Sequence, residues 1–64
     1  MELWIARYED GRLALFHEHP VYNYIRIIND YDWQFGDIIG HIDKTLFPKV
    51  TFENSPQKVK IELV

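Results

Sequence analysis

Apolar and polar side chains alternate with a period of two along most of this 64-residue chain. Successive side chains of a strand point to opposite faces of a sheet, so this period is typical of β-strands rather than helices. The clearest case is the segment 58–63, where Val59, Ile61 and Leu63 alternate with two lysines and a glutamate. Glycine or proline separates most of the alternating segments and favours turns there. The pattern predicts an all-β domain.

The first two alternating segments, residues 3–8 and 13–17, flank Glu9-Asp10-Gly11, a sequence typical of a β-hairpin turn. Two registers are compatible with it. With a three-residue loop and a glycine bulge, one face carries Trp4, Ala6, Tyr8, Ala14 and Phe16. With a two-residue Asp-Gly turn, Leu13 and Leu15 replace the last two. Acidic residues before the glycine suit a type I turn and favour the bulged loop. Either hairpin is apolar on both faces, which indicates a closed barrel or a two-layer packing.

Residues 21–28 predict a third strand, and Asn29-Asp30-Tyr31-Asp32 predicts a turn before a return strand that starts at Trp33. If Ile28 pairs with Trp33, then Arg26 lies opposite Phe35, and cross-strand partners share a face. One face of this second hairpin then carries five side chains, which we call the predicted stripe: Tyr22, Tyr24, Arg26, Trp33 and Phe35.

Residues 36–47 combine helix and strand signals. Ile38, Ile42 and Leu46 have a helix-like spacing, but Gly40 and the β-branched isoleucines favour a strand. We expect a strand through Ile42, one helical turn over residues 43–47 ended by proline, an alternating segment at 49–53, and a turn at 54–56. The prediction is a single domain over residues 1–64, an SH3-like barrel or strongly bent sheet of five to six antiparallel strands.

Size limits how such a domain is stabilised. A chain of 64 residues buries a small core, and without cysteine it has neither disulfides nor thiolate metal sites. Its hydrophobic content is nevertheless 47% and its aromatic content 16%, too rich for a disordered chain. These values predict an aromatic core or an apolar surface used for association, of which a homodimer is one form.

Charge and hydropathy argue against nucleic-acid-binding, membrane-spanning and secreted proteins. The net charge is −3, and the seven basic residues are scattered, whereas nucleic-acid binders generally carry a positive patch. No apolar run approaches the ~20 residues that span a bilayer. The N-terminal residues lack the basic start and apolar stretch of a secretory signal. We expect a cytoplasmic protein that binds no membrane, and its charge disfavours nucleic acid as a partner.

Both ends of the chain carry distinctive segments. They are Trp4-Ile5-Ala6-Arg7 followed by Asp10-Gly11, then LFPKVTFENSP at 46–56 and KVKIEL at 58–63. These segments resemble a group of short uncharacterised proteins from gut bacteria and their phages, and residues 20–45 share the resemblance more loosely. It implies no activity and carries over no functional residue. It implies an origin in a mobile element, where small stand-alone proteins often bind something larger.

His17 and His19 are the candidate metal ligands, because residues i and i+2 of a strand point to one side. Zinc and copper sites need three or four donors. The further donors would have to come from His41, Asp37 or Asp43. The alternative is that both histidines are solvated at the strand end before Pro20, and we expect no metal or cofactor.

Residues for catalysis are sparse. Ser55, the one serine, precedes a proline in a turn, and the three glycines are too dispersed for a phosphate loop. Paired aspartates in a turn, such as Asp30 and Asp32, most often accept hydrogen bonds from nearby backbone N–H groups. We therefore expect no enzyme.

The sequence is best explained as a non-catalytic protein-interaction module that binds through the predicted stripe, since Trp, Tyr and Arg dominate binding hot spots. If the chain comes from a phage or mobile element, its partner would be a host protein. One alternative is a small β-barrel that stacks single-stranded nucleic acid on the same rings. Another is a structural subunit of a larger assembly. The rings of the stripe can also be core.

Overall fold

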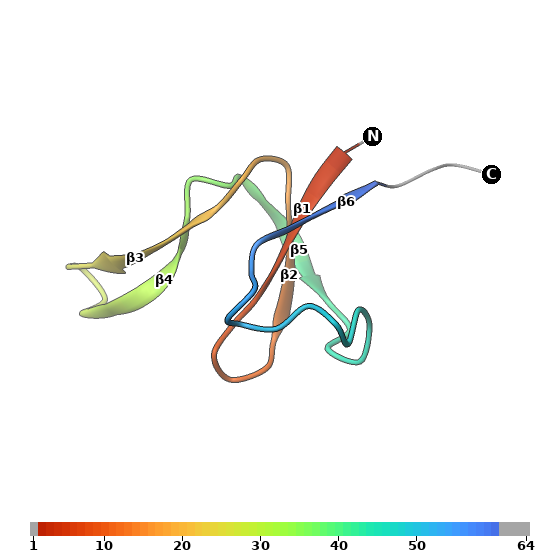
Figure 1. Ribbon diagram of the computed structural model, residues 1–64. Coiled ribbons are helices and arrows are strands. Elements are labelled where there is room, and N and C mark those ends of the chain that lie inside the picture. The colour runs from red at the N-terminus through yellow and green to blue at the C-terminus, as the bar shows by residue number, and fades with distance from the viewer. Residues whose placement is uncertain (1, 61–64) are drawn as a thin grey trace.

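The computed structural model describes residues 2–60 and shows six strands in two antiparallel sheets. The strands are β1 (Glu2–Arg7), β2 (Leu13–Phe16), β3 (Val21–Ile25), β4 (Asp30–Gln34), β5 (Ile38–Ile42) and β6 (Gln57–Lys60). Four of them form a sheet in the order β5-β2-β1-β6, whereas β3 and β4 pair only with each other (Figure 1). The predicted all-β fold is confirmed. The strands do not close into a barrel, one of the two forms predicted, and residues 2–60 contain no helix.

The β1–β2 hairpin has the predicted bulged loop. Ala6 pairs with Ala14, and the Tyr8 N–H donates to the carbonyl of Arg12 at 2.8 Å. The Gly11 N–H donates back to the carbonyl of Tyr8 at 3.0 Å. Gly11 has a φ of 99°, a conformation that glycine adopts without steric cost because it lacks a Cβ.

The four-stranded sheet buries apolar side chains on both faces, as the doubly apolar hairpin predicted. Ile5 and Ala6 are neighbours in β1, point to opposite faces, and are both fully buried. One core cluster consists of Ala6, Ala14, Phe16 and Trp33, and the other consists of Ile5, Leu13 and Val50. The base of the β3–β4 hairpin covers the first face. The segment 43–56, through Val50, covers the second.

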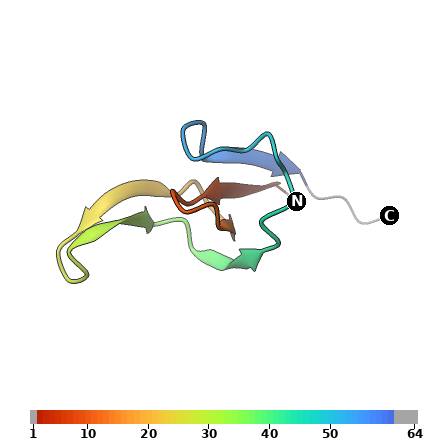
Figure 2. The same cartoon turned by 90° about the horizontal axis from the view of Figure 1, so that it is seen from below.

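The β3–β4 hairpin, called the ribbon below, extends away from the four-stranded sheet. Two views at right angles show it running out to one side, opposite the side where β6 ends (Figures 1 and 2). The molecule is elongated, with extents of 42 × 21 × 17 Å along its principal axes. Trp33 at the base of the ribbon is buried, whereas Ile27 in the turn at its tip is 96% exposed.

The register of the ribbon corrects the prediction. Trp33 pairs with Tyr22 and not with Ile28. The turn covers residues 26–29, three residues earlier than predicted. It closes at Asn29, whose φ of 54° lies in the left-handed region that asparagine tolerates better than most residues. Because of this shift, the predicted strand through residue 28 ends at Ile25.

The helical turn predicted for residues 43–47 does not form. The segment makes a turn in which the Leu46 N–H donates to the carbonyl of Asp43 at 3.0 Å. Phe47 has a φ of 50°, in the left-handed region, so the backbone leaves the helical conformation within the segment. The guanidinium of Arg7 holds the segment by its main-chain carbonyls. It donates to the carbonyls of Gly11, Lys44, Leu46, Phe47 and Val50.

The last part of the chain agrees with the prediction only in part. The alternating segment 49–53 is not a strand, and residues 52–54 form a turn. Asn54 stabilises this turn, because its side-chain oxygen accepts from the Thr51 N–H at 2.8 Å. The turn predicted at 54–56 thus lies two residues earlier, and residues 55 and 56 lead into β6. Ile61 and Leu63, the other apolar positions of the predicted last strand, lie outside the described residues.

Candidate binding surface

Four aromatic side chains share one face of the ribbon, because cross-strand partners and alternate residues of a strand lie on the same side. This aromatic row consists of Tyr22, Tyr24, Tyr31 and Trp33. The rings of Tyr22 and Tyr31 stack at a centroid distance of 5.6 Å and an angle of 15°. Tyr22 also meets Trp33 at 5.1 Å, and Tyr24 meets Tyr31 edge-on at 5.4 Å. Ring pairs at such distances contribute about 0.5–1.5 kcal/mol beyond their buried area.

The aromatic row is core at one end and surface at the other. The indole N–H of Trp33 donates to the carbonyl of Arg7 at 3.3 Å, which ties the base of the ribbon to β1. Phe52 packs edge-on against Tyr22 with a centroid distance of 4.9 Å. Further out, Tyr24 is 44% exposed and Tyr31 is 56% exposed. The outer half of the row is therefore accessible for contact.

Three of the five residues of the predicted stripe, Tyr22, Tyr24 and Trp33, lie in the aromatic row. The other two do not share its face. Arg26 lies in the turn, and Phe35 lies beyond the end of β4 with a φ of 66° and 74% exposure.

Tyr31 belongs to the row but not to the predicted stripe, because the sequence predicts a turn over residues 29–32. Its spacing of two residues from Trp33 was the signal that could have placed it on the same face. A turn ending at Asn29 would have revealed that spacing as part of a strand.

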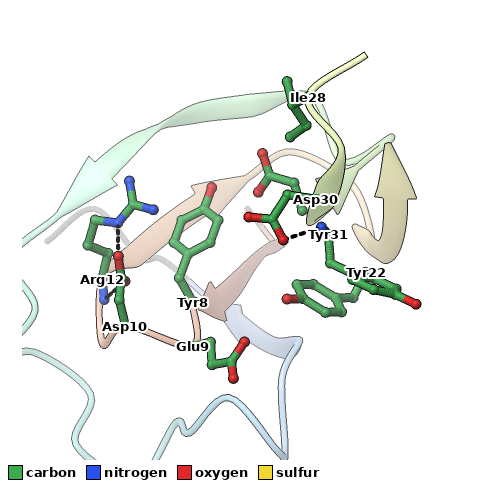
Figure 3. A pocket seen from close by; sticks show the side chains of 9 residues that line it. Tyr8, Glu9, Asp10, Arg12, Tyr22, Ile28, Asp30 and Tyr31 are labelled. Carbon is green, nitrogen blue, oxygen red and sulfur yellow. Dashed lines mark hydrogen bonds and ion pairs between the residues drawn. The ribbon is translucent and has the colours of Figure 1, made fainter. Parts of the chain in front are cut away.

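A cleft of about 450 Å³ lies between the ribbon and the β1–β2 turn (Figure 3). Its aromatic lining comes from Tyr8 on the β1–β2 side and from Tyr22 and Tyr31 on the ribbon side. Its charged lining consists of Glu9, Asp10, Arg12, Asp30 and Asp32. Four carboxylates thus face one guanidinium, so the cleft has an excess of three negative charges at neutral pH.

The tyrosines of the cleft experience this negative charge. Burial, followed by the charge of Asp32, raises the pKa of Tyr8. Partial desolvation, followed by the charges of Glu9, Asp30 and Asp32, raises the pKa of Tyr22. A nearby carboxylate disfavours the phenolate form, which is the physical cause of the second contribution.

Arg12 neutralises one carboxylate of the cleft. Its Nε lies 2.8 Å from Oδ2 of Asp10, and its backbone N–H donates to Oδ1 of the same side chain at 3.0 Å. These interactions, the backbone hydrogen bond first, lower the pKa of Asp10. The guanidinium carbon of Arg12 also lies 4.6 Å from the centroid of the Tyr8 ring, within cation–π distance.

The candidate metal ligands His17 and His19 lie beyond the end of β2, and both are exposed. The His19 ring packs edge-on against Trp4 at a centroid distance of 4.5 Å. His41, one of the further donors considered, packs against the ring of Tyr8 at 5.6 Å. Within residues 2–60, no three histidine or acidic side chains are grouped closely enough to hold a metal ion.

Ser55 has a structural role in the loop before β6. Its hydroxyl accepts from the Arg7 N–H at 2.9 Å and donates to the carbonyl of Thr51 at 2.6 Å. A serine nucleophile instead needs a base that accepts its proton. The hydroxyl therefore joins β1 to the 43–56 segment.

Comparison with known proteins adds no relative. No protein-family model matches the chain, and neither a curated protein nor a solved structure matches it significantly. Within the described part of the chain, no helix has the length and hydropathy that crossing a membrane requires.

Proposed function

We propose that the protein is a non-catalytic protein-interaction module that binds a different protein through the ribbon. The observation that supports this proposal is the isolation of the ribbon: neither β3 nor β4 pairs with the four-stranded sheet. A two-stranded hairpin is marginally stable in water. Its tip nevertheless presents Ile27 and Ile28 at 96% and 53% exposure. A partner that covers the tip would remove this apolar surface from water.

Charge favours a partner other than a second copy. The cleft between the ribbon and the β1–β2 turn has an excess of three negative charges, and the whole chain has a net charge of −3. Two copies that met through this region would place like charges together, which is unfavourable, whereas a basic surface would be attracted. The same charge opposes nucleic-acid phosphates, although the exposed rings would suit base stacking.

The resemblance of the chain ends to proteins of gut bacteria and their phages extends the proposal. On that basis the partner is a host protein in the cytoplasm of a bacterium. A subunit of a larger assembly would use the same contact. Homodimerisation is the competing form of association, and the crosslinking test below distinguishes it from binding to a different protein.

Site-specific photocrosslinking tests the proposal. A benzophenone amino acid replaces either Ile27 at the tip or the exposed Lys49 outside the ribbon, in the full chain expressed in a gut bacterium. We expect the Ile27 position to give a discrete product with a different protein, and the Lys49 position to give none. Ile28→Asp should abolish that product, because it places a charge in the apolar contact.

Two results would contradict the proposal. The Ile27 position would give no product, or it would give products in which two copies of this chain are joined. The second result would replace the host-protein partner with self-association.

A further inference from the structure

We propose that the cleft between the β1–β2 turn and the ribbon binds an arginine side chain of the partner protein. This inference rests on the proposed function, because it names the chemical group that the partner presents. The cleft adjoins the apolar tip, because Ile28 belongs to both, but its other lining is aromatic and charged. The tip supplies buried area, whereas the cleft would supply specificity for a cation.

The walls of the cleft are aromatic. Tyr8 stands on the β1–β2 side, and Tyr22 and Tyr31 stand opposite on the ribbon (Figure 3). Ring faces carry negative partial charge and attract cations within about 6 Å. Tyr22 and Tyr31 stack on each other with 15° between their planes, so the 56% exposed Tyr31 is the ribbon ring that offers surface to a flat group.

Carboxylates complete the cleft. Asp30 and Asp32 each use Oδ1 to accept the N–H of the next residue at 2.8 Å, which orients both side chains. Within residues 2–60, neither they nor Glu9 take part in an ion pair. An ionised carboxylate has about four acceptor sites, so each keeps the capacity to accept a charged donor.

The chain itself shows that this chemistry accepts a guanidinium. Arg12 lies over the ring of Tyr8 at 4.6 Å and forms an ion pair with Asp10 at 2.8 Å. Tyr22 interacts with the charges of Glu9, Asp30 and Asp32. On the ribbon side, Asp30 and Asp32 alternate with Tyr31 along β4, so carboxylates and a ring line the cleft from opposite faces of one strand.

Arginine fits this arrangement better than other cations. Its planar guanidinium stacks on rings and forms two parallel hydrogen bonds with a carboxylate, whereas the lysine ammonium is compact and strongly hydrated. A free small molecule is usually enclosed over most of its surface. This cleft is open, since Tyr31 remains 56% exposed, so a side chain that enters from a covering protein is the better occupant.

The test titrates the labelled full chain by NMR with three peptides of the form acetyl-Gly-Gly-X-Gly-Gly-amide. X is arginine, lysine or citrulline, the last being an uncharged isostere of arginine. We expect the arginine peptide to bind about tenfold more tightly than the citrulline peptide, and severalfold more tightly than the lysine peptide. Shifts should concentrate on the amides of Tyr8, Asp30 and Tyr31.

Matched charge variants locate the site. The double variant Asp30→Asn with Asp32→Asn retains both side-chain oxygens that accept from the backbone, so the ribbon should fold unchanged. We expect it to weaken arginine binding about tenfold, a loss typical of removing two charged partners. The control, Glu18→Gln with Glu53→Gln, removes the same charge from exposed positions outside the cleft and should change binding less than twofold.

The outcomes distinguish this inference from the proposed function. Equal binding of the arginine and citrulline peptides would overturn the arginine site, and so would equal loss in both double variants. If the Ile27 crosslink persists under those results, the ribbon remains the contact element. Selective arginine binding without a tip crosslink would support the cleft and overturn the ribbon proposal.

Discussion

The guanidinium of Arg7 donates a hydrogen bond to the main-chain carbonyl of Leu46, which lies 3.1 Å away and 39 residues later in the chain. The same side chain reaches further carbonyls of this segment, among them that of Lys44 at 3.1 Å. Val50, at the end of the segment, joins Ile5 in the second core cluster. One cation on β1 thus holds a loop without helix or strand against the sheet.

Arg7→Lys should lower the free energy of unfolding by about 2 kcal/mol or more, because charged hydrogen bonds contribute about 1.5–3 kcal/mol each and lysine cannot reproduce the guanidinium fork. Lysine carries its donors on one nitrogen, whereas the carbonyls around Arg7 are spread over several residues. Urea denaturation followed by tryptophan fluorescence measures the change. The exposed Arg12→Lys should stay within about 0.5 kcal/mol of the parent. Equal effects of the two variants would refute the role of Arg7.

Gly36→Ala should destabilise the protein by about 1–3 kcal/mol through overpacking. A Cβ at this position would lie 2.7 Å from Cδ2 of Phe16 and 2.8 Å from Cβ of Pro20, both closer than van der Waals contact. Gly40→Ala is the matched control, because its Cβ would meet nothing within 4 Å. We expect Gly40→Ala to be neutral or slightly stabilising, since alanine restricts the unfolded chain. Thermal unfolding of both variants decides the matter, and a Gly36→Ala protein as stable as the parent would be inconsistent with the close packing.

Phe52→Ala should loosen the base of the ribbon. Phe52 packs on Tyr22 at 4.9 Å and on Trp33 at 6.5 Å, so its removal exposes both rings. Because the side chain is half-buried, we expect a loss of about 2 kcal/mol, below the range for a fully buried phenylalanine. Tryptophan emission should shift to longer wavelength. Phe35→Ala, at a 74% exposed side chain, should leave both stability and emission unchanged. A larger loss of stability for Phe35→Ala than for Phe52→Ala would contradict this placement and put Phe35 on the aromatic face.

Asp43→Ala should lower the melting temperature at pH 7. Oδ1 of Asp43 accepts from the Thr45 N–H at 2.8 Å and from the Thr45 hydroxyl at 2.7 Å, and these bonds lower the pKa of Asp43. A carboxyl with a lower pKa in the folded state stabilises above its unfolded pKa of about 4, and this stabilisation is lost as the pH falls through the folded value.

The difference in melting temperature between the parent and Asp43→Ala should therefore shrink as the pH is lowered from about 5 to about 2. Asp43→Asn keeps a neutral acceptor and should fall between the two at pH 7. Melting curves recorded across this pH range supply the measurement. A difference that is constant with pH would show that the charge of Asp43 is not responsible.

The β1–β2 hairpin was predictable because its determinants are local. Strand alternation sets which side chains share a face, and the loop at Gly11 sets the register through its own backbone preference. The same reasoning failed for the ribbon, where Asn29 and Asp30 are both good turn residues. Placing the turn three residues too late moved Arg26 and Phe35 onto the aromatic face and left Tyr31 out.

Alternation and turn chemistry in the sequence were sufficient for the all-β class, the first hairpin and three of the four rings in the aromatic row. Tertiary structure decided the rest. Trp33 packs against Ala6 and Phe16, which selects the register of the ribbon, and Arg7 holds the 43–50 segment against the sheet. The cleft exists because the β1–β2 turn and the ribbon meet there. These outcomes depend on contacts between residues far apart in the chain, whose energies outweigh the small differences between local turn and helix preferences.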